Sequence, residues 1–336
     1  MVTLADVAKH AGVSSSTVSY VLSGKRTISE ETRRRVEQAV AELGYHPNAR
    51  ARALAARRSY IIALVVPLRP ESHDPTTMEI ATSVTIAARQ YGYDVLLITN
   101  DEGPEGVRRV ASSGLADGVI LMDVEPDDQR IPVLRELGTQ AALIGLPDEP
   151  GGLSSVDHDF AAAGGLCADH LADLGHREVA FISHPRHTAH ALGGFRDRAR
   201  RRGLRFVHRA SEGTYGGVAG TFARILADRP DTTAFVVQNE GAIGPLLTLL
   251  RGSGRTVPED ASVIAVGPGR LADQHTPRLT VVSGPDQELG RVAVEQLLRR
   301  LTAAARGEQP VDEQVLLTPV LTVGESTGPK GWDGKS

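Results

Sequence analysis

The first 22 residues place apolar side chains at helical spacing in two short runs, with a glycine between the runs. The apolar face of the first predicted helix consists of Leu4, Val7, Ala8 and Ala11. The inward face of the second helix is predicted to consist of Val18, Val21 and Leu22. Gly12 stands at the turn, where glycine tolerates a positive φ without strain. The pattern therefore predicts two short helices joined by a tight turn.

Polar residues mark where the predicted helices begin. Thr3 and Asp6 have the spacing of a capping box on the first helix, and Ser14 is a suitable N-cap for the second. A third helix is predicted to begin after Ser29 and to end at Gly44. Its apolar positions are Val36, Ala39, Val40 and Leu43. Three helices of this size form a small core.

The second helix leaves short polar side chains on its outward face: Ser15, Ser16, Thr17, Ser19 and Tyr20. A face that offers hydroxyls and a phenol but no acid suits the major groove of DNA, where it meets phosphates and base edges. This is the geometry of a helix-turn-helix, in which the second helix reads the DNA. The alternative is a solvent-exposed helical hairpin with no function.

From residue 60 onward the pattern changes to short apolar runs, which predict strands at Tyr60–Val66, Asp94–Ile98, Gly118–Met122, Ala141–Ile144, Glu178–Ile182, Ala234–Val237 and Ser262–Val266. Helix-length segments separate these runs, and this alternation is typical of parallel sheets covered on both faces. There are more strand–helix units than one small sheet can hold, so we predict two similar α/β lobes. Ligands in such sheets bind beyond the C-terminal ends of the strands, which places a ligand site in the cleft between the lobes.

Charge and cysteine content narrow the class of protein. The 336 residues carry a formal net charge of −4, but residues 1–58 hold ten Lys/Arg and five acids, which gives +5 there and −9 on the remainder. A basic head on an acidic body indicates a polyanion-binding module. The single cysteine, Cys167, excludes an internal disulfide and predicts a cytoplasmic location. Neither an export signal nor a membrane-spanning apolar run is found, so no membrane partner is expected.

Two stretches carry a specific resemblance: VTLADVAKHAGVSSSTVSYVLSG and ISEETRRRVEQAVAELGYHPNARARAL. They closely resemble the head of the lactose-repressor (LacI/GalR) family of bacterial transcription regulators. Motifs further along the chain agree with the resemblance, among them Leu174-Gly175-His176-Arg177, Pro277-Arg278-Leu279-Thr280 and Glu325-Ser326-Thr327.

The resemblance implies a small all-α helix-turn-helix head and an α/β body of two similar parallel-sheet lobes, like those of periplasmic binding proteins. The implied domains are a head over 1–46, a hinge helix or linker over 47–58, a body over 59–327 and a disordered tail over 328–336. Within the body, the N-lobe would comprise residues 59–157 and 284–317, and the C-lobe residues 158–283 and 318–327.

DNA-binding roles carried over from the family fall on Leu4, Ser14, Ser15, Ser16, Thr17, Ser19, Tyr20, Ser29, Thr32, Tyr45, Asn48, Ala51 and Leu54. Ser15, Ser16 and Tyr20 match the positions that choose bases. Ala51 and Leu54 match hinge-helix positions that enter the minor groove, where paired leucines of a dimer kink the duplex. The implied function is sequence-specific repression, with double-stranded operator DNA and a second copy of the chain as partners.

The predicted cleft departs from the family pattern. An aromatic pair after the first strand is absent, the usual ligand-clamping arginine is replaced by Ala191, and the usual aspartate after Val266 is missing. These departures argue against a plain sugar effector and leave open a different small molecule or none. The candidate effector contacts are Arg69, Asp74, Asp157, His190, Asn239 and Gly267.

No catalytic residue, cofactor or metal is expected. His184, His187 and His190 have a spacing that admits a metal, but no cysteine or nearby acid completes a site. The alternative for the whole chain is a solute-binding or enzymatic two-lobed protein with a vestigial head, because fold does not fix function. The intact caps, turn glycine and reader helix of the head argue against that alternative.

Overall fold

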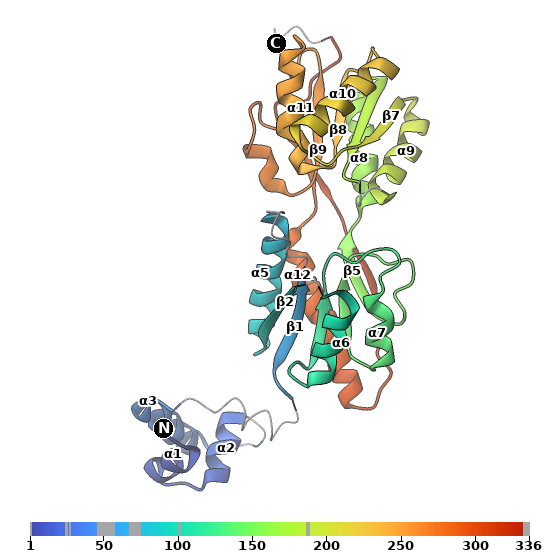
Figure 1. Cartoon of the computed structure of the whole chain (residues 1–336). Coiled ribbons are helices and arrows are strands. Elements are labelled where there is room, and N and C mark those ends of the chain that lie inside the picture. The colour runs from blue at the N-terminus through green and yellow to red at the C-terminus, as the bar shows by residue number, and fades with distance from the viewer. Residues whose placement is uncertain are drawn as a thin grey trace. The chain divides into compact units, whose positions relative to one another are not determined.

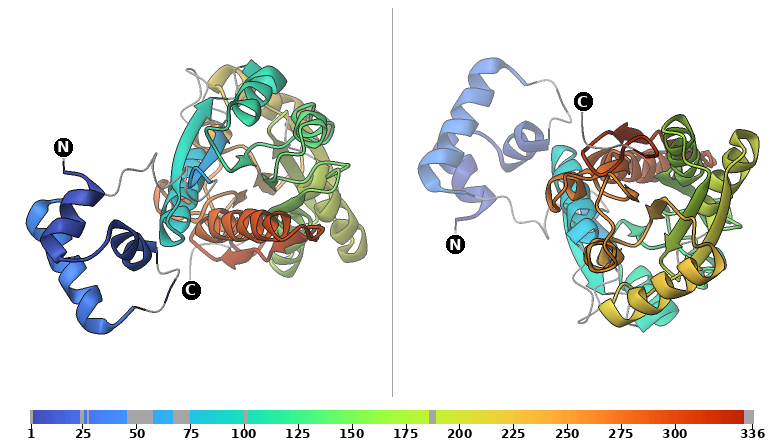
Figure 2. Two further views of the ribbon diagram at one scale, coloured as in Figure 1. Left: turned by 90° about the horizontal axis from the view of Figure 1, so that it is seen from below. Right: turned by 90° about the horizontal axis from the view of Figure 1, so that it is seen from above.

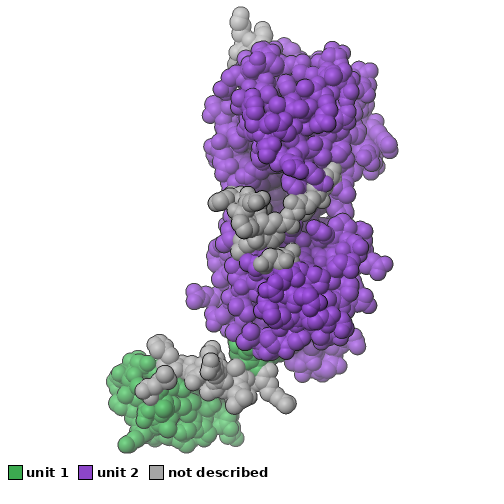
Figure 3. All heavy atoms as spheres, viewed as in Figure 1, with its two compact units in different colours: residues 1–60 green, residues 61–336 purple. Residues whose placement is uncertain are grey.

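The structure is a computed structural model that describes residues 2–23, 26, 28–45, 58–66, 75–99, 102–185 and 189–331. The chain divides into two compact units, unit 1 over residues 1–60 and unit 2 over residues 61–336 (Figure 3). Among the described residues, no helix is both long and apolar enough to cross a membrane.

The described part of unit 1 contains three helices, which are α1 (Leu4–Ala11), α2 (Ser15–Ser23) and α3 (Glu30–Leu43) (Figure 1). They enclose a small core of Val7, Ala8, Ala11, Val18, Val36, Ala39 and Tyr45. Leu22 was predicted to face this core, but its side chain is 38% exposed. Val21 packs against this core, whereas Leu22 does not belong to it.

Local hydrogen bonds define the ends of these helices. The backbone N–H of Thr3 donates to the Asp6 carboxylate at 2.8 Å, and the backbone N–H of Asp6 donates to the Thr3 hydroxyl at 3.3 Å. This reciprocal pair is the predicted capping box. The hydrogen bond to Thr3 also lowers the pKa of Asp6. Gly12 adopts φ 63° and ψ 39° at the turn between α1 and α2, as the sequence predicts.

Unit 2 contains two six-stranded sheets. The N-lobe sheet has the strand order β11-β5-β4-β3-β1-β2 and consists of β1 (Ile61–Val66), β2 (Asp94–Thr99), β3 (Gly118–Leu121), β4 (Ala141–Ile144), β5 (Ser154–His158) and β11 (Gln314–Leu317). The C-lobe sheet has the order β12-β10-β9-β8-β6-β7 and consists of β6 (Glu178–Ser183), β7 (Arg205–Ala210), β8 (Ala234–Val237), β9 (Ser262–Val266), β10 (Thr280–Ser283) and β12 (Val320–Thr322). All pairings are parallel except that of β10 with β12.

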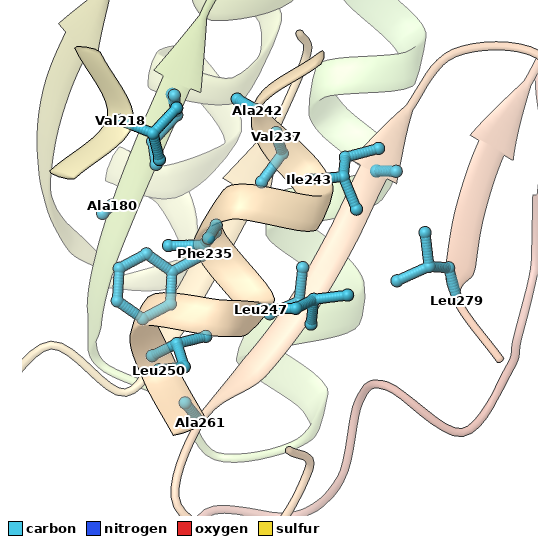
Figure 4. Close-up of a cluster of buried hydrophobic side chains, with 14 of the residues drawn as sticks. Ala180, Val218, Phe235, Val237, Ala242, Ile243, Leu247, Leu250, Ala261 and Leu279 are labelled. Atoms are coloured by element: carbon cyan, nitrogen blue, oxygen red, sulfur yellow. The ribbon is translucent and has the colours of Figure 1, made fainter. Parts of the chain in front are cut away.

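Helices cover both faces of each sheet (Figures 1 and 2). The N-lobe has α5 (Pro75–Gln90), α6 (Gly103–Ser113), α7 (Arg130–Glu136) and α12 (Asp286–Ala305), and the C-lobe has α8 (Phe160–Asp173), α9 (Ala189–Arg202), α10 (Tyr215–Asp228), α11 (Glu240–Gly252) and the short 3₁₀ helix η2 (Gly269–Asp273). Successive residues of β6 alternate between two cores. Ala180 and Ile182 pack in the core that includes α10 and α11, which Figure 4 shows around Phe235, whereas Val179 and Phe181 pack in the core that includes α8 and α9. The predicted fold class, a helical head with a two-lobed parallel-sheet body, is confirmed.

The chain passes between the two sheets three times. β5 of the N-lobe sheet leads to α8, β10 of the C-lobe sheet leads to α12, and β11 of the N-lobe sheet leads to β12. Each lobe is therefore assembled from separate stretches of sequence, and three connecting segments join the lobes.

The C-terminal stretch corrects the expectation of a disordered tail from residue 328. The backbone N–H of Gly328 donates to the Ser262 hydroxyl at 3.0 Å, and that of Lys330 donates to the Leu174 carbonyl at 2.9 Å. These bonds hold residues 328–330 against the C-lobe, and residues 332–336 lie outside the described part of the chain. A polar composition alone does not reveal such backbone partners.

A buried histidine lies beneath this C-terminal stretch. His176 accepts or donates at both ring nitrogens: Nδ1 lies 2.8 Å from the Thr233 hydroxyl, while Nε2 lies 2.9 Å from the Ser262 hydroxyl and 3.2 Å from the Gly328 carbonyl. A carbonyl only accepts, so Nε2 carries the proton and the Thr233 hydroxyl donates to Nδ1. Burial lowers the pKa of His176 to about 4.

Acid should therefore destabilise the protein through His176. The imidazole stays neutral in the folded state while the unfolded chain takes up a proton below pH 6.5, so stability falls as the pH drops from 6.5 toward 4. Between pH 7 and 4.5 this group should remove roughly 2–3 kcal/mol from the free energy of unfolding. Urea unfolding of wild type and His176→Gln at both pH values measures it. An equal pH dependence in the two proteins would contradict the assignment.

Candidate nucleic-acid interface and interlobe residues

The outward face of α2 is open to solvent. Ser15, Ser16, Ser19 and Tyr20 are exposed, Thr17 is half-buried, and Val18 between them is fully buried. The polar and the apolar residues of α2 lie on different faces of the helix. Helical periodicity separates them, because the apolar residues pack in the core of unit 1. The structure thus brings the predicted α2 side chains together on one exposed face.

Ser14 organises the N-terminal end of α2. Its hydroxyl accepts from the backbone N–H of Thr17 at 3.1 Å and lies 2.8 Å from the hydroxyls of both Ser16 and Thr17. This cap fixes a cluster of three hydroxyls at the positive end of the helix dipole, where a phosphate is favoured.

A basic side chain that the sequence reasoning did not select lies beside the reader face. The Arg26 guanidinium is 5.6 Å from the centroid of the Tyr20 ring, within the range of a cation–π contact. The only sequence signal was the basic pair Lys25-Arg26, which follows the second predicted helix in the sequence. The contact restricts the direction of the phenol and keeps a positive charge at the same surface.

A second residue that the sequence reasoning missed fixes the angle between helices. Arg35 of α3 donates from Nη2 to the carbonyls of Ala11 and Gly12, the latter at 3.3 Å, and so ties α3 to the turn that precedes α2. A Cβ at Gly12 would lie 2.7 Å from that nitrogen. The turn therefore needs glycine both for its positive φ and for the space that Arg35 occupies.

The remaining predicted DNA contacts differ in burial, and three of them lie outside the described residues. Ser29 is exposed and caps α3, because its hydroxyl accepts from the backbone N–H of Thr32 at 3.4 Å and donates to the Thr32 hydroxyl at 2.9 Å. Leu4 is partly buried against the core, and Tyr45 is 7% exposed within it. Asn48, Ala51 and Leu54 lie outside the described residues.

Four of the predicted effector contacts are described. Both polar atoms of the Asn239 side chain form hydrogen bonds with the protein backbone. The amide nitrogen donates to the Ser211 carbonyl at 2.6 Å, and the amide oxygen accepts from the backbone N–H of Gly241 at 3.1 Å. The second bond caps α11. Asp157 accepts from the backbone N–H of His158 at 2.8 Å. His190 is exposed in the first turn of α9, and the backbone N–H of Gly267 donates to the Val282 carbonyl.

Arg69 and Asp74 lie outside the described residues, as does His187 of the histidine triplet. Over the described ranges, no group of three or more histidine, cysteine, aspartate or glutamate residues is arranged to hold a metal ion.

Two connecting segments meet through a hydrogen bond between side chains. His158 at the end of β5 and Asp286 at the start of α12 lie 2.8 Å apart between Nε2 and Oδ1, and both side chains are largely buried. Gly284 packs directly on the imidazole, where a Cβ would lie 2.0 Å from Nδ1. His158 is therefore a contact between two connecting segments.

Two family models match the chain. Residues 3–48 match the model for bacterial regulatory proteins of the lacI family, and residues 168–327 match the model for the periplasmic binding protein-like domain. The first match spans the three helices of unit 1, and the second spans most of the C-lobe.

Known proteins match over nearly the whole chain. The HTH-type transcriptional regulator CelR of Thermobifida fusca is 31% identical, over 96% of this chain and 98% of that protein. A solved complex of the transcriptional regulator CelR with cellobiose is 29% identical, with a TM-score of 0.71 and coverage of 97% of this chain and 100% of that one. The lac repressor dimer bound to operator and the anti-inducer ONPF is 26% identical, with a TM-score of 0.78 and coverage of 97% and 99%. The chain therefore belongs to the LacI family of bacterial transcriptional regulators.

Proposed function

We propose that the protein is a cytoplasmic, sequence-specific repressor that binds a near-palindromic operator as a homodimer. The observation that carries this proposal is the exposed hydroxyl face of α2, held by an intact cap, turn and core. We assign DNA binding to residues 1–46, a hinge to residues 47–58 and regulation to the body. Since the matched relatives are regulators, we assign the body no catalytic activity.

In this proposal Ser15, Ser16 and Tyr20 contact base edges in the major groove. Arg26 orients the Tyr20 ring through the cation–π contact. Leu4, Ser14, Thr17, Ser19, Ser29, Thr32, Tyr45 and Asn48 contact the phosphate backbone. The N-terminal ends of the helices and the cap hydroxyls suit phosphate oxygens.

An exposed apolar surface on the N-lobe supports the dimer. On α5, Met78 and Ile86 are 48% and 58% exposed, and Leu97 of the neighbouring strand β2 is 45% exposed. β2 is an edge strand of its sheet. Packing two copies of this surface together would bury these side chains and place two heads on one duplex.

The proposed effector is a small molecule that binds in the body. The CelR complex contains cellobiose and the lac repressor complex contains ONPF. In this chain Asn239 is already occupied by backbone partners, and Ala191 is fully buried where an arginine would clamp a sugar. We propose that a small molecule other than a plain sugar binds between the lobes, near Asp157, His190 and Gly267.

Selection of duplexes from a random DNA pool by the full-length protein tests the function. We expect recovered sequences to share an inverted repeat, because each head of a dimer reads one half-site. Recovery of sequences without a shared motif would refute sequence-specific binding, and recovery of single half-sites would refute the dimer.

The reader face gives a prediction about base choice. Tyr20→Ala and Ser16→Ala should each weaken operator binding by about 1–3 kcal/mol and leave binding to random DNA nearly unchanged, because only base contacts distinguish the two. Fluorescence anisotropy on both duplexes measures the difference. Tyr91→Ala, which removes an exposed tyrosine of the N-lobe, is the matched control. Equal losses on operator and random DNA would mean that these side chains contact only phosphates.

Leu54 gives a second prediction, which rests on the family resemblance. Residues 49–58 form too short a segment to be a stable helix in isolation, so we expect two copies to become helical together on DNA. Leu54→Ala should then lower operator affinity and DNA bending together, because it removes both the packing and the minor-groove wedge. A FRET bending assay measures both. A variant that bends DNA like wild type would contradict the mechanism, and so would loss of the dimer in sedimentation.

A further inference from the structure

Arg270 of η2 connects the two lobes of unit 2. Within its own lobe, Nη1 and Nη2 donate to the two carboxylate oxygens of Glu240 at 2.8 and 3.0 Å. Glu240 is the first residue of α11, so the bidentate pair fixes the guanidinium against a helix end of the C-lobe. The C-lobe thus orients the Arg270 side chain through a bidentate ion pair.

The same guanidinium also contacts the N-lobe. Its Nη2 donates to the Thr76 hydroxyl at 3.1 Å, and its Nε lies 3.1 Å from a carboxylate oxygen of Glu79. Thr76 and Glu79 belong to the beginning of α5, whose N-terminal end is directed at the lobe that carries η2 (Figure 1). The Arg270 side chain is only 19% exposed, which strengthens these contacts relative to those of a freely solvated pair.

This contact is separate from the connecting segments. The chain crosses between the lobes after β5, β10 and β11, where His158 and Asp286 pair. Arg270 adds a non-covalent link between α5 and η2, two elements that no crossover joins directly. A separation of the lobes about the crossovers would therefore have to break the contacts of Arg270 with Thr76 and Glu79.

We propose that Arg270 is an interlobe latch that holds the lobes together in the ligand-free protein. Glu240 of the C-lobe orients the guanidinium, and Thr76 and Glu79 of the N-lobe contact it. The latch sets the lobe geometry before any effector binds, so an effector that separates the lobes has to break an ion pair that the protein makes by itself. Its regulatory meaning rests on the proposed function, in which lobe geometry controls operator binding.

The test measures the distance between the lobes by double electron–electron resonance. Spin labels are attached to cysteines introduced at Ser112 of α6 and Thr248 of α11, both of which are exposed. The native Cys167 is fully buried, and burial raises the pKa of its thiol, so it does not compete for the label. Dilution with unlabelled full-length protein removes distances between copies.

Wild type without ligand should give one narrow distance distribution. Glu79→Gln and Arg270→Gln should both add a population at longer distance, with the ratio of open to closed forms rising about fivefold, the effect of losing one surface ion pair. Glu79→Gln keeps the Arg270–Glu240 pair, so its effect cannot arise from a misfolded C-lobe. Arg278→Gln is the matched control, because it breaks an ion pair with Asp273, 2.7 Å apart, inside the C-lobe.

Unchanged distributions in Glu79→Gln and Arg270→Gln would overturn the latch, as would an equal change in Arg278→Gln. The measurement needs no DNA, so its result is independent of operator binding. A wild-type protein that selects no DNA motif refutes the proposed function, whereas only the distance distributions decide whether Arg270 links the lobes.

Discussion

The affinity of the protein for its operator should fall by about 10³- to 10⁵-fold when the salt concentration rises from about 50 to 200 mM, if about six to ten phosphates are neutralised. The physical reason is counterion release, because each lysine or arginine that replaces a condensed cation returns that cation to the solution. The head and the hinge segment together carry +5 over residues 1–58, against −9 on the remainder of the chain. Two of its acids are already engaged within unit 1, Asp6 with Thr3 and Glu42 with His10 at 2.7 Å.

Anisotropy titrations at several salt concentrations measure the slope of log affinity against log salt. Random duplex DNA is the control: it should give a similar slope at lower affinity, because the phosphate term does not depend on sequence. A flat response on operator DNA would show that the basic head is not the binding surface.

The largest effect on stability is expected at the crossing of α8 and α9. A Cβ at Gly194 would lie 1.9 Å from the Ala161 carbonyl oxygen, and a Cβ at Gly164 would lie 2.0 Å from the Ala191 carbonyl oxygen. Both contacts are with backbone, which cannot rotate away as a side chain can. Gly194→Ala should therefore push the helices apart and lower the free energy of unfolding by about 3 kcal/mol or more, at the upper end for overpacked cores.

Gly193→Ala is the control, because the adjacent glycine has no heavy atom within 4 Å of its Cβ position. In the middle of a helix this change should stabilise by up to about 1 kcal/mol through helix propensity. Chemical unfolding followed by circular dichroism compares the two variants. Similar unfolding midpoints would show that the crossing is looser than the structure indicates.

Sequence reasoning could predict those parts of the fold in which the apolar positions along the chain are also the positions that the structure buries. The head was predictable because Thr3, Ser14 and Ser29 cap helices in the structure and Gly12 turns the chain between two of them. β4, β8 and β9 were predicted with their observed bounds, because strands buried on both faces are continuous apolar runs.

The missed strands are those that lack such runs. β7 is an edge strand that reads Arg-Phe-Val-His-Arg-Ala, so charged and polar residues interrupt its apolar positions. β5 reads Ser-Ser-Val-Asp-His because it leads into a crossover, where polar side chains meet those of another connecting segment. β7 has no buried residue, and β5 is largely buried but mainly polar, so neither strand shows the continuous apolar run of a central strand.

The residues between the lobes were the least predictable. Arg270 was not selected, because its partners Thr76 and Glu79 are nearly 200 positions away in sequence and nothing local signals the contact. Asn239 was selected as an effector contact, although its amide is bonded to the backbone at Ser211 and Gly241. A single sequence shows which polar residues follow a strand, but only the packed lobes show which of them are already occupied.

The three crossings between the sheets have a consequence for how the protein is made. The N-lobe sheet receives β11 and the C-lobe sheet receives β12 only when the last part of the chain is present. A polypeptide that ends before Gln314 leaves β5 and β10 as open edges, and such edges template aggregation. On the ribosome, the N-lobe therefore cannot close until almost the entire chain has emerged. A nonsense mutation late in the gene is expected to remove the protein altogether, rather than to leave a DNA-binding fragment that competes with the intact regulator.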